Sequence, residues 1–417
     1  MGDECSGPRW PSGGSCRDRP APPESAQTIG VLGAGLMGRA IAVAAAQHGL
    51  DVRLSDTAPD VLAGSVAACH DVLGRLSFGQ GARRGEVRPI VSEAEWTECD
   101  VLIEAVLEKL AVKRRVLSRL EPKLRDDCLV ASNTSSLCIA DIAAALQRPQ
   151  RMCGLHFLHP VAQRDLVEVV PGPQTCFDSL QRGLGFVAQL NKTAIQVRDC
   201  PGFVVNRLLM AYLGEALVML TEGTAMATLE RAAIALGMPM GPMAQIDQIG
   251  VDVVARVGAS FSGRQQSRPS VGRLLKTLYE SRSWGCKTGR GFYRYGTDGT
   301  IAIDQETQSI LKRYVQQHRS LSRPEIGQRL GWTLALEASC LLEERVVGSI
   351  REIDLATSRG LGFSGQITSV FDWVRLMGLD QLLDWSSSQA HMYPHLQPTR
   401  ALLSALGEFQ PSARRAA

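Results

Sequence analysis

Long hydrophobic runs, paired cysteines and blocks of like charge are all missing from this chain. Hydrophobic residues make up 45% of it, yet no run approaches the roughly 20 residues that cross a bilayer, so we expect no membrane association. Eleven cysteines lack C-x-x-C pairs and metal-ligand spacing, which predicts reduced thiols, no metal site and a cytoplasmic location. A net charge of +3 without a basic block gives no reason to expect nucleic acid as a partner.

The first 26 residues differ in composition from the rest of the chain. Prolines at positions 8, 11, 20, 22 and 23 lie among glycine, serine and arginine, with no apolar stretch typical of a secretory signal. Such a segment cannot bury a core, so we predict a disordered tail over residues 1–26. The remaining residues are enough for two to three domains, each with its own core.

Strands and helices are predicted to alternate over residues 27–200. An apolar strand at 29–32, a helix at 36–48 and a strand at 52–54 form one βαβ unit. Further strands are expected at 101–103, 129–131, 152–156 and 166–170, with helical stretches such as 112–120 between several of them. This alternation predicts an α/β Rossmann domain, a doubly wound sheet of parallel strands.

From residue 201 the pattern becomes helical, and it occurs twice. Residues 122 positions apart match: Asn206-Arg207-Leu208 with Gln328-Arg329-Leu330, Glu215-Ala216 with Glu337-Ala338, and Leu220 and Glu222 with Leu342 and Glu344. We therefore predict an all-α domain present as two tandem repeats, at 201–296 and 323–410, joined by a linker at 297–322. Two copies of one unit can pack together as an internal pseudo-dimer.

A glycine motif joins the first predicted strand to the first helix. Gly33, Gly35 and Gly38 form G-x-G-x-x-G, which lets the backbone approach a pyrophosphate at the helix N-terminus. Asp56 ends the second strand 18 residues after Gly38. A carboxylate there can bind the ribose hydroxyls and repel a 2′-phosphate, so NAD is predicted rather than NADP. A plain glycine turn is the alternative.

Polar residues near other strand ends are candidates for catalysis. His156 lies near the end of an apolar strand, and Glu168 lies inside another, where a carboxylate needs a partner. If the strands are adjacent, Glu168 can hold the imidazole and raise its proton affinity, as suits a general base acting on an alcohol. A core histidine in a structural ion pair is the alternative. Ser135 follows a strand and Asn206 begins a helix, so helix capping and an ordinary polar helix position remain open for them.

Together these residues resemble the 3-hydroxyacyl-CoA dehydrogenases over nearly all of residues 28–390. The resemblance rests on six segments in the family's order, namely 29–38, 103–108, 133–137, 154–157, 166–170 and 201–207. The duplicated helical part is similar to the dehydrogenase half of the multifunctional fatty-acid oxidation alpha subunits, without their hydratase half.

The resemblance implies NAD-dependent oxidation of (S)-3-hydroxyacyl-CoA to 3-oxoacyl-CoA in fatty-acid beta-oxidation or related acyl-CoA metabolism. It implies that His156 is the base, that Glu168 orients it, and that Ser135 and Asn206 position the substrate oxygen. The cofactor contacts that it implies are Gly33, Gly35, Leu36, Met37, Gly38, Asp56, Glu108, Lys113, Ser135 and Lys287. An acyl-CoA substrate is expected, a homodimer or an internal pseudo-dimer remains open, and a thiolase or hydratase subunit is a candidate partner.

The chain departs from the family's pattern in three places. His159 stands where the family usually has asparagine, and Arg164-Asp165 where it has Met-Lys. The segment between Asp56 and Val101 is short and rich in Gly and Arg at 79–85, where relatives carry a helical hairpin that helps hold CoA. Two alternatives therefore stay open: a catalytically weakened paralogue that binds NAD or a partner, and a dehydrogenase of another 3-hydroxy acid.

Overall fold

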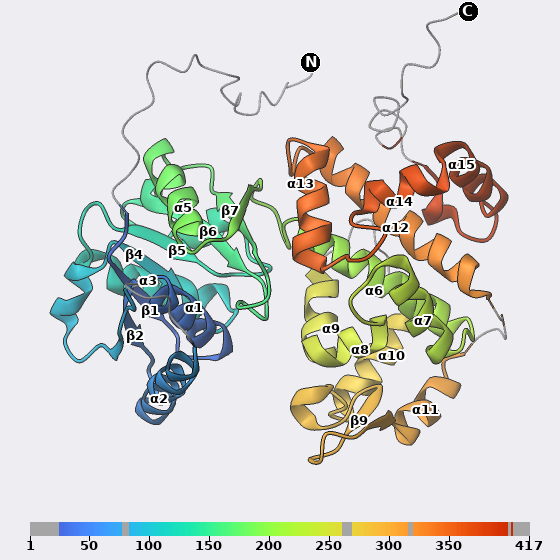
Figure 1. The fold of residues 1–417 in the computed structure, drawn as a ribbon, viewed down its shortest axis with the longest axis horizontal. Helices are drawn as coiled ribbons and strands as arrows, with labels where there is room; N and C mark the ends of the chain where they lie inside the picture. Colours follow the sequence, from blue (N-terminus) through green and yellow to red (C-terminus); the bar gives the residue numbers. More distant parts are fainter. Residues whose placement is uncertain are drawn as a thin grey trace, which may run out of the picture.

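The chain folds into two parts that lie side by side, as a computed structural model shows (Figure 1). The structure describes residues 25–76, 83–260, 269–315, 319, 321–398 and 402. Nearly all of the tail predicted at 1–26, and much of the Gly- and Arg-rich segment at 79–85, therefore lie outside the described residues. The N-terminal part combines strands and helices, and the C-terminal part is mainly helical.

One mixed sheet of eight strands forms the centre of the N-terminal domain. The strands are β1 (Thr28–Leu32), β2 (Asp51–Ser55), β3 (Val87–Pro89), β4 (Val101–Glu104), β5 (Leu129–Ser132), β6 (Met152–Phe157), β7 (Leu166–Pro171) and β8 (Thr193–Gln196). Their order in the sheet is β3-β2-β1-β4-β5-β6-β7-β8. The strand order reverses between β1 and β4, and ligands of this fold bind at the carboxyl ends of the strands at such a point.

Strands β1 to β6 are parallel, as the sequence predicts, but β7 runs antiparallel to β6, and β8 is parallel to β7. Only eight residues, 158–165, connect these strands, whereas a parallel connection needs a crossover of roughly a dozen or more. The prediction that all strands are parallel is therefore wrong for this part of the sheet, because so short a connection favours an antiparallel pair. The antiparallel register places His156 directly opposite Glu168.

Helices cover both faces of the sheet. They are α1 (Leu36–Gln47), α2 (Pro59–Arg75), α3 (Leu110–Leu120), α4 (Ile139–Ala143) and α5 (Phe177–Gln189). The buried residues of α1, α2 and α5 share one hydrophobic cluster, and those of α3 and α4 belong to a second. Alternate residues of the strands belong to one cluster or the other, because strand side chains alternate between faces. The second cluster continues into the helical domain.

The helical domain follows in two stretches. The first holds α6 (Val205–Thr221), α7 (Met226–Leu236), α8 (Pro242–Ile249), α9 (Val251–Ser260) and α10 (Pro269–Glu280). The second holds α12 (Arg323–Glu343), α13 (Ile350–Leu355), α14 (Val370–Met377) and α15 (Leu379–Ser388). Between them lie the antiparallel strands β9 (Tyr293–Tyr295) and β10 (Ile301–Ile303) and the helix α11 (Gln305–Lys312). The predicted linker at 297–322 thus contains α11, and the hairpin crosses its first boundary.

Helices α6 and α12 pack against each other with opposite directions. Arg207, near the start of α6, donates to Glu337 (2.7 Å) and to Glu344 (2.6 Å) near the end of α12. Arg329, near the start of α12, pairs in turn with Glu215 and Glu222 of the other helix. In each cluster, an arginine near the start of one helix pairs with two glutamates of the other helix.

The Arg329 cluster is the more deeply buried of the two. The Arg329 side chain is 2% exposed, and its guanidinium lies 3.8 Å from the centre of the Tyr393 ring. The Tyr393 hydroxyl donates to Glu222 (3.1 Å), and His395 lies 3.0 Å from Glu215. Burial would raise the pKa of Glu215, but His395 and Arg329 hold it below its usual range.

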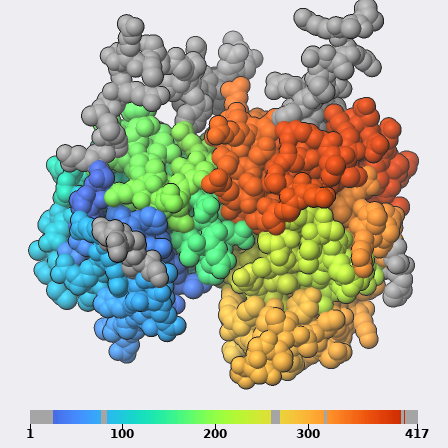
Figure 2. Space-filling model, in the orientation of Figure 1, coloured from blue at the N-terminus to red at the C-terminus, as the bar shows by residue number. Residues whose placement is uncertain are grey.

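The second helical stretch also contacts the sheet of the N-terminal domain. The space-filling view shows the two domains as lobes in contact (Figure 2). A π-helical segment, Ala356–Leu361, lies against β7, and a Cβ on its Gly360 would come within 2.8 Å of Val205 and 3.2 Å of Leu166. Arg359 donates to the hydroxyl of Thr193 in β8 (2.5 Å). The C-terminal stretch therefore supports the edge of the sheet that carries Glu168.

Candidate active site

His156 and Glu168 form a buried pair across β6 and β7. Nδ1 of His156 lies 2.5 Å from Oε2 of Glu168, and the two residues are 3% and 0% exposed. Leu155 and Val169 point into the cluster of α1, α2 and α5, so alternation turns the pair to the opposite face, toward the helical domain. The sequence hypothesis that the two strands lie side by side is confirmed.

The loop before α6 fixes the second oxygen of Glu168. The backbone N–H groups of Val204 and Val205 donate to its Oε1 at 2.8 and 3.0 Å. Gly202 and Phe203 take left-handed backbone angles, with φ of 73° and 51°, to make this turn. A bulky residue is costly there, and such strain concentrates at functional sites. The ring of Phe203 lies 5.5 Å from the imidazole of His156, a contact that the sequence analysis missed.

Ser135 and Asn206 complete the group around the imidazole. Because Nδ1 of His156 donates to the carboxylate of Glu168, its Nε2 carries the free lone pair. The hydroxyl of Ser135 lies 3.2 Å from this nitrogen. The amide of Asn206 donates to the backbone carbonyl of Ser135 at 3.1 Å, so the start of α6 is tied to the loop after β5. All four residues predicted for catalysis meet here.

Glu108 holds the loop after β5 in place. Its Oε1 accepts from the backbone N–H of Ser135 (2.9 Å) and Ser136 (3.0 Å) and from the hydroxyl of Thr134 (2.6 Å). Burial would raise the pKa of Glu108, but Lys113 and these donors hold it below its usual range. Glu108 is therefore a carboxylate that positions the loop of Ser135.

Lys113 lies beneath this loop and is 0% exposed. Its ammonium lies 2.7 Å from Glu104 and 3.1 Å from Glu108, and the hydroxyl of Ser132 also donates to Glu104 (2.6 Å). A buried ammonium is tolerated because two carboxylates surround it. These contacts give Lys113 a positioning role, and its predicted contact with the cofactor stays a prediction.

The glycine turn has the shape of a pyrophosphate cradle. Gly33 has φ of 104°, and a Cβ there would come within 2.6 Å of the carbonyl oxygen of Ala105. A Cβ on Gly38 would come within 1.8 Å of the carbonyl oxygen of Gly33, so these two glycines close the turn. A Cβ on Gly35 would meet nothing within 4 Å. Open space thus lies at the N-terminus of α1, where free N–H groups attract a phosphate, and the residues present fit a dinucleotide.

Asp56 directly follows β2 beside this turn. Its Oδ2 accepts from the N–H of Ala34 (2.8 Å) and its Oδ1 from the N–H of Ala58 (3.0 Å). These bonds fix the carboxylate next to the glycine turn with lone pairs left for ribose hydroxyls. Leu36 is 59% exposed at the mouth of α1, and Met37 beside it is partly exposed.

Lys287 does not join this group in the structure. Its ammonium pairs with Asp252 of α9 and lies 5.6 Å from the centre of the Trp284 ring, all within the helical domain. Among the described residues, no helix is long and apolar enough to cross a bilayer. The described part of the chain also holds no group of three or more His, Cys, Asp or Glu residues placed to bind a metal ion.

Comparison with known proteins identifies the family. Residues 28–200 match the family described as "3-hydroxyacyl-CoA dehydrogenase, NAD binding domain", and residues 202–295 match the "3-hydroxyacyl-CoA dehydrogenase, C-terminal domain". The chain belongs to the 3-hydroxyacyl-CoA dehydrogenase family, and its N-terminal domain is the NAD-binding domain of that family. The predicted fold of a Rossmann domain followed by a helical domain is thereby confirmed.

Individual relatives agree with this assignment. The chain is 32% identical to a fatty acid oxidation complex subunit alpha from Psychrobacter arcticus in an alignment 402 residues long that covers 92% of this chain and 56% of the relative. It thus spans about half the length of that relative. An (S)-3-hydroxybutyryl-CoA dehydrogenase from Ralstonia eutropha is 32% identical, with a TM-score of 0.59, over 66% of this chain and 100% of that one. A 3-hydroxybutyryl-CoA dehydrogenase from Escherichia coli shares the fold over 93% of this chain and 100% of that one, with a TM-score of 0.75 and 22% identity.

Two alanine substitutions distinguish the glycine that leaves room for the cofactor, Gly35, from a glycine that closes the turn, Gly38. Gly35→Ala places its methyl group in open space, so the melting temperature should stay unchanged while NAD⁺ affinity falls about tenfold or more, because the pyrophosphate loses its close approach. Gly38→Ala collides with the backbone of Gly33, so it should also lower the melting temperature. Calorimetric titration with NAD⁺ and thermal unfolding measure the two effects. Equal NAD⁺ affinity in wild type and Gly35→Ala would show that the cofactor binds elsewhere.

Proposed function

We propose that this protein oxidises the 3-hydroxyl group of (S)-3-hydroxyacyl-CoA to the 3-oxo group with NAD⁺ as the acceptor, in fatty-acid beta-oxidation or related acyl-CoA metabolism. The observation that carries the proposal is the buried pair of His156 and Glu168, next to Ser135 at the carboxyl edge of an NAD-binding sheet. An alcohol oxidation needs a base for the hydroxyl proton and an acceptor for the hydride, and this arrangement supplies a place for both.

In this mechanism Nε2 of His156 takes the hydroxyl proton of the substrate. The carboxylate of Glu168 stabilises the imidazolium that forms and keeps the free lone pair on Nε2. The hydroxyl of Ser135 lies 3.2 Å from Nε2 and positions the substrate oxygen next to this nitrogen. Asn206 fixes the loop of Ser135 through its hydrogen bond to the backbone carbonyl. NAD⁺, when bound, accepts the hydride that leaves C3.

The assay that tests this proposal measures NADH formation with two substrates, (S)-3-hydroxybutyryl-CoA and free (S)-3-hydroxybutyrate. We expect NADH with the thioester and little with the free acid. Activity with the free acid alone would contradict the thioester assignment and favour a dehydrogenase of another 3-hydroxy acid. NAD⁺ binding without turnover of any 3-hydroxy compound would favour a catalytically weakened paralogue.

His159 is the departure from the family that bears most on the paralogue alternative. It follows β6 and is exposed, and the partial burial of its imidazole together with the charge of Arg164 lowers its pKa. A histidine that is neutral near pH 7 can still offer one donor and one acceptor, as an asparagine does. We therefore propose that the protein is an active enzyme despite His159, because His156, Glu168, Ser135 and Asn206 retain their mutual contacts.

We further propose that residues 201–296 and 323–410 are two copies of one helical unit that pack as an internal pseudo-dimer. The reciprocal ion pairs support this, because Arg207 with Glu337 and Arg329 with Glu215 are related by the same offset of 122 residues. This arrangement would take the place of a homodimer. A relative named as a subunit of a fatty acid oxidation complex supports a partner subunit, for which a thiolase or hydratase is our candidate, and we also propose a cytoplasmic location.

The remaining cofactor contacts are part of the same proposal. Leu36 and Met37 at the mouth of α1 would lie against the dinucleotide, because they directly follow Gly35 and are exposed and partly exposed. Glu108 would act near the nicotinamide through the loop of Ser135. Lys287 would need to exchange its bond with Asp252 for one with the cofactor.

A further inference from the structure

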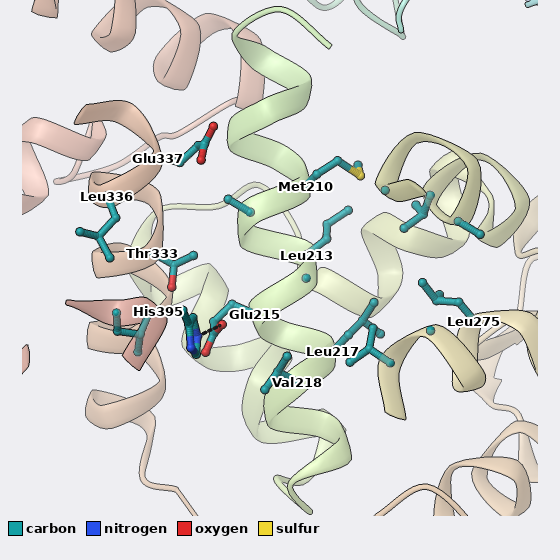
Figure 3. A pocket seen from close by; sticks show the side chains of 18 of the residues that line it. Met210, Leu213, Glu215, Leu217, Val218, Leu275, Thr333, Leu336, Glu337 and His395 are labelled. Carbon is teal, nitrogen blue, oxygen red and sulfur yellow. Dashed lines mark hydrogen bonds and ion pairs between the residues drawn. The ribbon is translucent and has the colours of Figure 1, made fainter. Parts of the chain in front are cut away.

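A large cavity lies in the helical domain beside α6. Its volume is about 1050 Å³, at the upper end of the roughly 300–1,000 Å³ typical of small-molecule sites. The walls come from α6, α9, α10, α12 and the short segment 394–397. In the close-up view, Met210, Leu213 and Leu217 lie along the side of α6 that faces Leu275 of α10 (Figure 3). His156 and Glu168 are not in its lining, so the cavity is separate from the imidazole pair.

On α6 the cavity lining begins at Met210, one helical turn after Asn206. Asn206 contacts the loop of Ser135, and Met210 follows it by four residues on the same face of α6. Leu213 and Leu217 continue this face, because they follow at seven and eleven residues. The distance from Asn206 to Leu217 along the helix axis is about 16 Å. At about 1.2 Å per bond, an extended hydrocarbon chain of roughly a dozen methylenes covers that length.

The acidic groups in the lining are already paired, and the cations Arg256 and Lys276 also line it, with Lys276 3.8 Å from Glu280. Glu215 binds Arg329 and His395, Glu337 binds Arg207, and Asp252 binds Lys287. A cationic ligand would have to break these bonds to reach a carboxylate, whereas an apolar ligand would not. The apolar lining includes Met210, Leu213, Leu217, Val254, Val271 and Leu275.

Glycines keep the cavity open from three helices. Gly214 of α6, Gly258 of α9 and Gly272 of α10 line it, and a Cβ on any of them would meet nothing within 4 Å. Glycine inside a helix costs about 1 kcal/mol relative to alanine, so backbone stability does not explain these residues. The position 122 residues after Gly214 is Leu336, so leucine is accommodated at the corresponding place in α12.

We propose that this cavity binds the acyl chain of the substrate, and that the enzyme therefore prefers medium and long chains. The inference rests on the proposed function for the identity of the substrate. The hydroxyl end lies at Ser135 and Asn206, and the chain follows α6 past Met210 toward Leu217. Each buried methylene contributes about a fourfold gain in binding, so the preference accumulates along the chain.

The test compares (S)-3-hydroxybutyryl-CoA with (S)-3-hydroxyhexadecanoyl-CoA. In wild type we expect kcat/KM to be roughly 100-fold or more higher for the longer substrate. This ratio is set well below the product of a gain of about fourfold for each additional methylene. Gly214→Leu fills the cavity without a backbone collision, as Leu336 does in α12. We expect it to lower the ratio of the two kcat/KM values at least tenfold while the melting temperature is retained, because leucine favours the helix.

Gly327→Leu is the matched control. Gly327 also lies inside a helix, α12, and its Cβ would meet nothing within 4 Å, but it does not line the cavity. We expect this variant to keep the wild-type ratio. If Gly214→Leu folds poorly, Gly272→Leu fills the same cavity from α10, where a Cβ also has open space.

Palmitoyl-CoA has no 3-hydroxyl group to oxidise, so calorimetric titration with it tests binding of the acyl chain separately from the proposed reaction. Tighter binding of palmitoyl-CoA than of butyryl-CoA, lost in Gly214→Leu but kept in Gly327→Leu, supports the acyl site even if turnover fails. Equal ratios in wild type and both cavity variants, with turnover intact, overturn the acyl site and leave the proposed function standing. A cavity variant that instead changes the oligomeric state, with an unaltered chain-length ratio, also overturns it and makes a second copy of the chain the occupant.

Discussion

His156→Gln should reduce kcat for NADH formation by about 10²- to 10⁴-fold, the usual contribution of a general base. Glutamine has a similar size and can donate to Glu168, but it cannot accept the hydroxyl proton near neutral pH. NAD⁺ affinity should stay within about twofold of wild type, because His156 does not contact the glycine turn or Asp56. Initial rates of NADH formation and calorimetric titration with NAD⁺ measure the two quantities.

Glu168→Gln is the companion variant for a positioning residue. Its side-chain amide would face either the N–H groups of Val204 and Val205 or Nδ1 of His156. Either orientation leaves an N–H group without its acceptor. This disturbs the position or the tautomer of His156, so kcat should fall and the pH dependence of kcat should change, while KM changes less. For the His156→Gln variant, the contradicting outcomes are unfolding at ordinary temperature or full activity. Either result would show that the pair of His156 and Glu168 has a structural role and not a catalytic one.

Arg329→Met should lower the free energy of unfolding by about 3–5 kcal/mol, the usual effect of breaking a buried ion pair from one side. The substitution removes the guanidinium between Glu215 and Glu222, whose side chains are 5% and 8% exposed. Two carboxylates then remain in a place that water reaches poorly. Denaturant unfolding monitored by tryptophan fluorescence gives the value, provided that the transition is two-state.

Arg207→Met is the matched control, because it removes the corresponding arginine of the other cluster. Its partner Glu344 has a side chain that is 29% exposed and can be rehydrated, so we expect a smaller loss of about 1–3 kcal/mol. Equal losses in the two variants would contradict the difference in burial. A loss below about 1 kcal/mol for Arg329→Met would show that the contact between α6 and α12 does not depend on its ion pairs.

Local signals in the sequence were enough for the dinucleotide-binding half of the fold. The glycine motif, Asp56 and the apolar strands each depend on neighbours along the chain, and the structure places them as expected. The reversal of β7 and the β9–β10 hairpin were not predicted, although each has a local signal in the sequence: a short connection before β7, and the turn at Asp298 and Gly299 in the hairpin. The pair of His156 and Glu168 could be predicted because one strand register decides it.

The surroundings of Lys113 and Lys287 and the cavity beside α6 could not be predicted from the sequence, because they depend on packing between distant segments. Lys113 looks like a surface charge on α3, yet it is buried between two carboxylates from other segments. Lys287 finds Asp252, 35 residues earlier, through the packing of α9. The cavity beside α6 depends on how α9, α10 and α12 meet, and in the sequence it appears only as glycines inside helical segments. Such relations require the distances that the fold creates.

The most direct measurement of the central claim is a crystal structure of the protein with NAD⁺ and acetoacetyl-CoA bound. The account predicts that the C3 oxygen of the ligand lies within about 3.2 Å of Nε2 of His156 and next to the hydroxyl of Ser135. It also predicts that C4 of the ligand points toward α6 at Met210. A C3 oxygen bound away from His156, with the imidazole still enclosed by protein, would contradict the assignment of this histidine as the base.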